Sequence, residues 1–442
     1  MKINRRRFIF GSVLVGGGAL FTYSATRPSR HRRANVDLAQ GEERYITSFI
    51  KIEPGNEITI YVPHSEMGQG IHTSLSMMAA DELDANWEEV NIEQAPAIDL
   101  FANGDLVRGF AGEFGVPDFL MGLVGASAFA VAEIGNLQTT GGSSSVRYTG
   151  EHGMRVAGAA ARKMLIEAAA VRWGVPVEGL STKLSHVQHN ATGRSFSYGE
   201  LAAEAALMEP PENPRLKDRS QFNIMGKAIS RNDIPAKVDG SAMYGLDAHS
   251  DDMLYAAIRM APVFGTKLVS ANTQPAFSVR GVEDVIELED SVAVVADSYW
   301  RAKKALELVE TEWEASENDS VSSTDIAARF DRELADSNGS KDKEVGDADA
   351  ALSSAADYIE ASYRVPYLAH AAMEPMNCTV HIKGDTADLW TSTQDALGIK
   401  GRVARIADLK EDNVTFHQTY CGGGFGRRLP FNWNMIDHAT LI

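Results

Sequence analysis

Cys421–Arg428, with the sequence CGGGFGRR, is the stretch on which the fold assignment depends. Three consecutive glycines allow a backbone to take positive φ angles and to approach a ligand with no Cβ in between. In residues 413–420 apolar and polar side chains alternate, which predicts a strand. A strand, a glycine turn and two arginines suit an anionic ligand, because backbone N–H groups and guanidinium groups bind phosphate well. Taken alone, the simpler interpretation is a tight turn with solvated arginines.

The composition is that of a globular protein with room for two or three domains. The chain has 442 residues, of which 44% are hydrophobic and 23% charged. Its formal net charge of −18 argues against nucleic acid and against an anionic membrane surface as partners. Residues 1–33 are the exception, since they hold eight basic groups and no acidic one.

The basic N-terminal end has the layout of an export signal. Arg5–Ile9 forms a twin-arginine pattern, and a weakly apolar stretch over residues 8–25 follows it. We therefore predict export to the periplasm by the twin-arginine route. No clean small-x-small cleavage site follows, so the alternative is an uncleaved N-terminal anchor, the only membrane contact expected. Twin-arginine export carries folded proteins, often with a cofactor inserted, so the signal itself suggests a cofactor.

Cys378 and Cys421 are the only cysteines. Two cysteines cannot build a disulfide framework or a CxxC metal site. A single bond between them is possible but not implied.

Two further turns precede helical patterns. Residues 57–62 alternate as a strand, and apolar residues recur at helical spacing from Ile71 to Leu83. Gly68–Gly70 then lies at a helix N-terminus, which favours an anion; a plain turn is the alternative. Residues 139–145, rich in Thr, Gly and Ser, similarly precede a helix expected at 151–173, whose small-residue face allows close packing.

The rest of the chain is less regular. Residues 95–140 suggest loops around a short helix, and the proline-rich 210–214 marks a boundary. Strand-like runs around a helix predict an α+β unit over 221–313, followed by an acidic connecting segment. His370 and Glu374 could be catalytic. The alternative is that His370 is a core histidine with its hydrogen bonds satisfied and Glu374 a capping carboxylate, and composition alone favours this alternative.

In combination, four motifs resemble the molybdenum-binding large subunit of the xanthine dehydrogenase and aldehyde oxidase family. The two-subunit branch typified by the isoquinoline 1-oxidoreductase beta subunit is the best match. The motifs are Glu66–Gly70, Ile234–Gly240 with Tyr244 and Gly245, His370–Pro375, and Thr391–Gln394 with Gly422–Arg428. Their order and spacing agree over residues 45–429.

The resemblance implies a multi-subdomain α+β architecture that includes an α/β hammerhead domain. The expected segments are a signal or anchor with a linker (1–44), a molybdopterin-binding-type segment (45–215), the hammerhead domain (221–315), an acidic linker (316–355) and the start of the first molybdopterin-binding domain (356–442).

The resemblance also implies a chemistry. Such enzymes hydroxylate an aldehyde carbon or a carbon beside nitrogen in an N-heteroaromatic compound, with oxygen taken from water. The implied cofactor is molybdopterin in its cytosine dinucleotide form, with no protein side chain on the metal. Electrons are expected to pass to a [2Fe–2S] cluster on a separate small subunit.

By motif match, Gln394 resembles the glutamine that hydrogen-bonds a molybdenum oxo ligand. His370 and Glu374 match a motif near the substrate funnel. The residues implied in cofactor binding are Gln69, Gly70, Ser143, Ser144, Ser145, Gly423, Gly424, Phe425 and Arg427.

The sequence departs from the family after Arg428. The family's large subunit continues well beyond this point and there carries the glutamate general base, so no Glu of this chain is assigned as the base. A truncated product is expected, and a non-catalytic remnant is the alternative function. A nucleotide- or phosphate-binding protein is a weaker one, since no acidic residue follows a G-x-G-x-x-G turn at the distance that a ribose contact needs.

Overall fold

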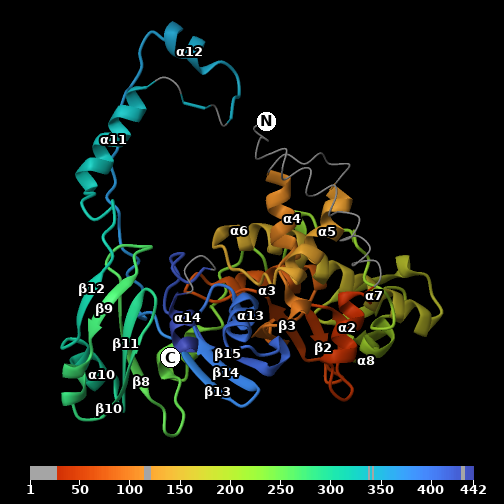
Figure 1. The fold of residues 1–442 in the computed structure, drawn as a ribbon. Helices are drawn as coiled ribbons and strands as arrows, with labels where there is room; N and C mark the ends of the chain where they lie inside the picture. The colour runs from red at the N-terminus through yellow and green to blue at the C-terminus, as the bar shows by residue number, and fades with distance from the viewer. Residues whose placement is uncertain (1–26, 114–120, 337–338, 341–342, 430–433) are drawn as a thin grey trace. The chain divides into compact units, whose positions relative to one another are not determined.

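The computed structural model describes residues 27–113, 121–336, 339–340, 343–429 and 434–442. It mixes helices with short sheets, which confirms the predicted α+β class (Figure 1). The chain divides into two compact units, one of residues 1–248 with 372–441 and one of residues 249–371. The twin-arginine pattern of residues 5–9 lies outside the described residues. In the described part, no helix combines the length and the apolar character that crossing a bilayer requires.

Three small sheets and the helices around them form the first unit. The four-stranded sheet has the order β1-β2-β3-β4, and the two three-stranded sheets have the orders β5-β6-β7 and β13-β14-β15. The strands are β1 Arg44–Thr47, β2 Ile50–Ile52, β3 Ile58–Val62, β4 Val90–Gln94, β5 Leu180–Lys183, β6 His186–His189, β7 Ser195–Ser197, β13 Thr379–Lys383, β14 Thr386–Thr391 and β15 Val414–Gln418. The α-helices are α2 Arg30–Asp37, α3 Ile71–Leu83, α4 Gly104–Glu113, α5 Met121–Ile134, α6 Ser143–Ser145, α7 Arg155–Trp173, α8 Tyr198–Ala205, α9 Ile234–Asp239, α13 Ala396–Ile406 and α14 Asn434–Leu441.

Two strand–helix–strand crossovers organise this unit. β3 pairs in parallel with β4 across α3, and β14 pairs in parallel with β15 across α13. In α3, the residues at helical spacing (Ile71, Leu75, Ala79 and Leu83) are fully buried, as the sequence predicts. Figure 1 shows α13 against the sheet of β13, β14 and β15. Because ligands bind beyond the carboxyl ends of parallel strands, these crossovers indicate where a site would form.

The small-residue face of α7 packs against α3, as predicted. Ala157, Ala161, Leu165 and Ala168 are buried there. At Gly158 the approach is closest, because a Cβ would lie 2.2 Å from the backbone oxygen of Ala79. No side chain fits at that distance, so the glycine sets the spacing of the two helices.

Gly158→Ala is expected to destabilise the chain by about 1–3 kcal/mol, because the added methyl group would push α7 away from α3. Helix propensity alone predicts the opposite sign, with alanine favoured by about 1 kcal/mol. Denaturant unfolding of both proteins decides between them. Val171→Ala, on the exposed side of the same helix, is the control and should change stability by about 0.5 kcal/mol or less.

The expectation of loops around a short helix in residues 95–140 was wrong, because α4 and α5 occupy most of this region. Glycines at 104 and 109 belong to α4. There they face the rings of Phe129 and Tyr148 so closely that a Cβ would overlap them. The small residues therefore serve close helix packing, which a composition-based prediction assigns to loops.

Residues 27–37 are part of the folded first unit. Ala34 of α2 is fully buried, and Arg33 is paired with Asp99 and Glu133. Burial lowers the pKa of Arg30, whose guanidinium donates to the carbonyl of Leu100.

The second unit contains two antiparallel sheets with the orders β10-β11-β8 and β12-β9. Its strands are β8 Tyr255–Met260, β9 Leu268–Asn272, β10 Val282–Glu287, β11 Ser291–Ala296 and β12 Glu310–Trp313, and its helices are α10 Tyr299–Leu306, α11 Ser323–Ala335 and α12 Ala348–Ser354. α10 packs against β8 and β11, and its Ala302 and Ala305 lie in the core with Val292 and Val294. The sequence predicts the other strands and helices of this unit but not the polar edge strand β9 or the short helix α12, and the expected hammerhead bounds of 221–315 stay a prediction.

Candidate functional site

Three turns of the first unit meet beyond the carboxyl ends of β3, β14 and β15. They are residues 63–70, 392–395 and 419–426. The backbone N–H of Cys421 donates to the carbonyl of Glu66 at 3.3 Å, and that of Gln394 donates to the carbonyl of Arg428 at 3.1 Å. The fold thus brings together turns that the sequence analysis singled out separately.

Glu66 organises the turn after β3. Its buried carboxylate accepts hydrogen bonds from the backbone N–H groups of Gly68 and Gly70 at 2.9 Å each and of His72 at 3.2 Å. Arg231 pairs with it at 3.2 Å and also donates to the carbonyl of Gly68 at 2.7 Å. The carboxylate therefore occupies the helix N-terminus at which the sequence predicts a bound anion.

Gln69 and Gly70, both predicted pterin contacts, are engaged within the chain. The side chain of Gln69 is exposed, accepts from the N–H of Met67 at 2.6 Å and donates to the carbonyl of Ser65 at 3.0 Å. The N–H of Gly70 is taken by Glu66. In this arrangement the turn is closed by its own residues, and the pterin contact stays a prediction.

Glu374 and Arg428 form a buried ion pair at 3.3 Å beneath the glycine turn. The carboxylate of Glu374 also accepts from the N–H groups of Gly245 at 3.0 Å and Gly422 at 2.8 Å, and from the hydroxyl of Ser392 at 2.6 Å. Both oxygens of the carboxylate are therefore occupied by donors of the chain itself, as expected for a carboxylate that caps backbone N–H groups. The predicted role near a substrate funnel stays a prediction.

Arg428 is fully buried and fixes the backbone around it. Its guanidinium donates to the carbonyls of Gly423 at 3.1 Å, Ser392 at 3.2 Å and Glu374 at 2.7 Å. Sequence reasoning treated the two arginines as anion ligands. The structure assigns Arg428 to the architecture of the turn, whereas Arg427 is half-buried and donates to the amide oxygen of Asn434 at 3.3 Å.

Gln394 presents an unpaired acceptor. Its Nε2 donates to the carbonyl of Thr140 at 3.1 Å, and its buried Oε1 has no hydrogen-bond partner among the described residues. A Cβ at Gly424 would lie 2.9 Å from this oxygen and 2.3 Å from Sδ of Met67. Glycine is required here because any side chain would overlap the sulfur of Met67 and the Gln394 amide.

Phe425 stands out in the same turn. It is 69% exposed and has a φ of +51°, a left-handed conformation that is unfavourable for a bulky residue. Gly423, at φ +115°, provides the preceding bend. Residues held in such conformations concentrate at functional sites, which makes the turn 422–426 the strongest candidate for ligand contact.

Ser143, Ser144 and Ser145 form the first helical turn before a π-helix at Val146–Met154. The hydroxyl of Ser144 donates to the carbonyl of Gly141 at 2.7 Å. The hydroxyl of Ser145, which is buried, accepts from the backbone N–H of Gly141 at 2.8 Å. Ser143 is exposed. Two of the three predicted phosphate contacts therefore stabilise their own turn.

His370 lies in the second unit with an exposed side chain. In the described residues no cluster of His, Cys, Asp or Glu has an arrangement that could hold a metal ion. Burial raises the pKa of Cys378 to about 12 and that of Cys421 to about 11, so neither thiol is reactive at neutral pH.

Asp395 was missed by the sequence analysis. Its carboxylate accepts from the N–H of Gln138 at 2.9 Å and caps α13 through Gly398 at 3.4 Å. Thr139 forms a β-bridge with Asp395, and the N–H of Thr140 donates to the carbonyl of Gln394 at 2.6 Å. Asp395 therefore fixes the strand that orients the Gln394 amide.

Burial raises the pKa of Asp395 from 3.8 to about 7, against the lowering effect of its backbone hydrogen bonds. A raised folded-state pKa means that the native state holds the proton longer than the unfolded state. This group therefore lowers stability as the pH rises from about 4 to about 7. Asp395→Asn, which keeps a capping side chain, is expected to remove that decline. Unfolding midpoints across this pH range test it, with the exposed Asp412→Asn as a control that leaves the decline unchanged.

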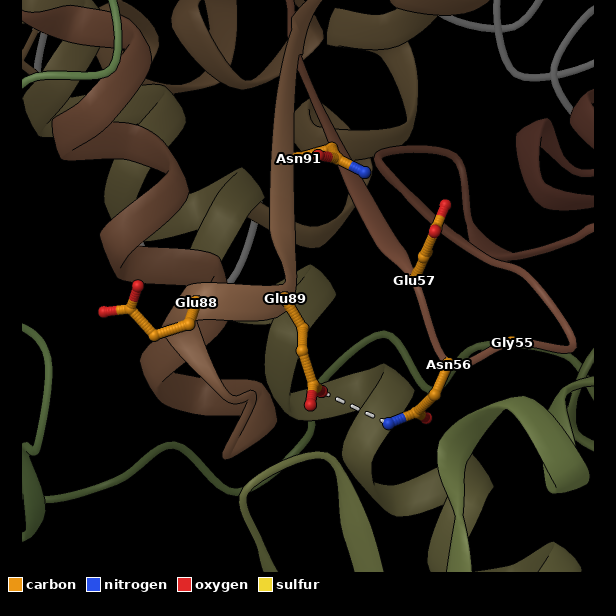
Figure 2. Close-up of a pocket in the computed structure, with 6 residues that line it drawn as sticks. All are labelled: Gly55, Asn56, Glu57, Glu88, Glu89 and Asn91. Atoms are coloured by element: carbon orange, nitrogen blue, oxygen red, sulfur yellow. Dashed lines mark hydrogen bonds between the residues drawn. The ribbon is translucent and has the colours of Figure 1, made fainter.

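One acidic hollow lies away from these turns. Gly55, Asn56, Glu57, Glu88, Glu89 and Asn91 line it. Asn56 donates to Glu89 at 3.3 Å, while the carboxylates of Glu57 and Glu88 point away from each other (Figure 2). The hollow is at the amino ends of β3 and β4, opposite to the three turns, and has no role in the candidate site.

Of the missed site residues, Glu66 had a local signal. Glu66 lies in a motif that the sequence analysis quoted, and a carboxylate two positions before a glycine turn is a capping pattern. Arg231 and Thr140 act through tertiary contacts, and the sequence alone gives no indication of their partners.

Comparisons with known proteins show what this chain is similar to. Residues 331–440 match the family described as molybdopterin cofactor-binding domain. The chain is 30% identical over 436 residues to isoquinoline 1-oxidoreductase subunit beta of Brevundimonas diminuta, an alignment that covers 89% of this chain and 52% of the relative. It is 28% identical over 447 residues to the membrane-bound aldehyde dehydrogenase (pyrroloquinoline-quinone) of Gluconacetobacter polyoxogenes, covering 97% of this chain and 52% of the relative.

Among solved structures, quinoline 2-oxidoreductase from Pseudomonas putida 86 is similar with a TM-score of 0.35 and 18% identity, over 46% of this chain and 31% of that one. The chain spans about half the length of the curated relatives it matches.

Proposed function

Because the chain belongs to the xanthine dehydrogenase and aldehyde oxidase family of molybdopterin-binding large subunits, we propose that it is the molybdenum-binding part of an oxidoreductase. The proposed reaction is the hydroxylation of an aldehyde or N-heteroaromatic compound with oxygen from water. The observation that carries the proposal is the unpaired, buried Oε1 of Gln394 beneath Gly424.

The residues present fit a bound molybdopterin in two respects. The turn at 422–426 approaches Gln394 through a glycine, against which Sδ of Met67 also packs, and Gln394 offers a fixed, unpaired polar atom. Gln394, Gly423, Gly424 and Phe425 would hold the cofactor. When bound, the molybdenum centre would supply oxygen transfer from water and accept two electrons.

The orientation of Gln394 defines what it can do. Its Nε2 is committed to the carbonyl of Thr140, and a flipped amide would place two acceptors against each other. The unpaired atom, Oε1, is an acceptor, which takes a hydrogen bond from a hydroxyl or amine of a ligand. The Nε2 group has a second N–H beside the one that the carbonyl of Thr140 takes, so donation to an oxo ligand, the role suggested by resemblance, stays a prediction.

Neither Glu66 nor Glu374 is available as a general base, because both carboxylates are buried and accept several hydrogen bonds. The proposal therefore places the base in the part of the relatives that this chain does not match. It also includes the cytosine dinucleotide form of the cofactor, a [2Fe–2S] small subunit as partner and a periplasmic location. The resemblance supports the first two, and the twin-arginine pattern supports the third. None of the relatives favours the remnant or the phosphate-binding alternative.

Molybdenum content is the test. The chain, co-expressed with an iron–sulfur partner in a host that loads a full-length relative, is expected to retain near-stoichiometric molybdenum by elemental mass spectrometry. Gly424→Ala is expected to lower the retained metal at least about tenfold, because the added methyl group would overlap Sδ of Met67 and push the turn away from Gln394. Gly55→Ala, where no atom lies within 4 Å of the new Cβ, is the matched control and should retain the metal.

A metal-free chain from that host would contradict the proposal. Binding of pyrroloquinoline quinone in place of molybdenum, detected by its absorbance after extraction, would also contradict it.

A further inference from the structure

His64 is a buried titratable residue to which the proposed function gives no role. It follows β3, in the turn of residues 63–70, and only 1% of it is exposed. Its carbonyl accepts from Nε2 of His72 at 2.9 Å. Burial lowers the pKa of His64 to about 3, so the imidazole is neutral at neutral pH. A neutral imidazole has one donor nitrogen and one acceptor nitrogen.

The two ring nitrogens of His64 face different segments. Nε2 lies 2.8 Å from the hydroxyl of Thr149, which is 1% exposed and belongs to the π-helix Val146–Met154. On the other side, Nδ1 lies 3.5 Å from the hydroxyl of Thr140, and the ring donates to the backbone of Thr139. Because a backbone carbonyl can only accept, we assign the ring proton to Nδ1. The hydroxyl of Thr149 then donates to Nε2.

Thr140 connects this histidine to Gln394. The N–H of Thr140 donates to the carbonyl of Gln394 at 2.6 Å, and its carbonyl accepts from Nε2 of Gln394 at 3.1 Å. The hydroxyl of Thr140 accepts from the N–H of Ser65 at 2.8 Å. Thr140 is therefore held between the turn that carries His64 and the turn that carries Gln394. A displacement of Thr140 would remove the acceptor that fixes the Gln394 amide.

We propose that His64 is a positioning residue for Gln394. Together with Thr149 it holds residues 139–140 in place, so that Nε2 of Gln394 stays bonded to Thr140 and Oε1 stays available to a ligand. In this role His64 acts through Thr140 and transfers no proton. The inference rests on the proposed function, since the orientation of Gln394 matters only where a ligand uses its oxygen.

The π-helix supports this role. Such helices are rare and occur often at functional sites, and this one supplies the hydroxyl that pairs with His64. A core histidine with satisfied hydrogen bonds is the simpler interpretation. It makes a different prediction, because loss of the Thr149 hydroxyl would then affect overall stability and leave the Gln394 amide unchanged.

The test removes one hydroxyl from the full chain. Thr149→Val keeps a branched side chain but leaves Nε2 of His64 without its donor. In a chain made with isotope-labelled glutamine, we expect the side-chain NH2 of Gln394 to exchange with solvent at least about tenfold faster than in the parent. Its NMR signals are assigned by their loss in Gln394→Glu. Thr149→Ser, which retains the hydroxyl, should exchange like the parent.

The second readout is the molybdenum retained in the molybdenum-loading host. Thr149→Val should retain about tenfold less than the parent, the usual scale for groups that orient the contacts of a metal site. Thr149→Ser should retain the parent amount. His64→Phe should lower the retained metal similarly, and adding Thr149→Val to it should have no further effect, since the two residues act through one network.

Tyr198→Phe is the matched control. It removes another buried hydroxyl of the first unit, which donates to the carbonyl of Leu83 at 2.6 Å, and it should change neither readout. Unchanged exchange of the Gln394 side chain in Thr149→Val would overturn the inference. An equal effect of Tyr198→Phe would also overturn it, because stability alone would then explain the result. A parent chain without molybdenum would contradict the proposed function alone, since the exchange readout needs no metal and still decides whether His64 positions Gln394.

Discussion

Glu374→Gln is expected to destabilise the chain by about 3–5 kcal/mol, the usual effect of removing one member of a buried ion pair. The substitution would leave the fully buried Arg428 without its charge partner. Both carboxylate oxygens of Glu374 accept from donors alone. The NH2 group of glutamine would therefore replace one of these acceptors with a further donor. One oxygen accepts from Gly245 and Asn377, and the other accepts from Ser392 and Gly422. The glycine turn would lose its anchor on both sides.

Chemical denaturation with a fluorescence readout measures this effect. Glu333→Gln is the matched control, because its ion pair with Arg329 is exposed and should contribute about 1 kcal/mol or less. Arg428→Met combined with Glu374→Gln should be less destabilising than the sum of the two single changes, since no unpaired charge stays buried. A loss below about 1 kcal/mol for Glu374→Gln would show that the pair does not hold the turn.

Glu66→Ala should destabilise the chain by at least about 3 kcal/mol. The carboxylate accepts from three backbone N–H groups at the start of α3, and each donor left unpaired costs about 1–3 kcal/mol where it is buried. Arg231 would lose one of its two carboxylate partners and keep Asp233. We expect faster amide exchange over residues 66–72 as well as a lower unfolding midpoint.

Gln69→Ala provides the comparison. Its side chain is exposed and makes two local hydrogen bonds, so its loss should change stability by about 1 kcal/mol or less. If Gln69→Ala were the more destabilising change, the assignment of Glu66 as the organiser of this turn would be wrong.

Local patterns in the sequence predicted much of the fold. α3, β3 and β15 were all expected within a residue or two, because helically spaced or alternating apolar residues face the core, fully buried in α3 and β3 and partly buried in β15. α4 and α5 were missed, since their glycines signal loops by composition but serve close contacts with aromatic rings. Composition cannot distinguish these two uses.

The sequence predicted which motifs belong to the site but not which residues of those motifs contact one another. The motifs around Glu66, Gln394 and Gly424 do meet, as the resemblance implied. The periodicity of the sequence could not predict this, because it indicates local elements and not which of them come into contact. The helix N-terminus at Gly70 was expected to bind an external anion, and Glu66 occupies it. An internal carboxylate and a ligand phosphate satisfy the same N–H groups, so the sequence cannot tell which of them is present.

The second unit interrupts the first between residues 248 and 372. The ribosome therefore releases the Glu66 turn long before Glu374 and Arg428 are made, and these segments can meet only by closing a long loop. Contacts of such high contact order form slowly. A ligand that needs both the Glu66 turn and the glycine turn can be captured only after translation has passed Arg428.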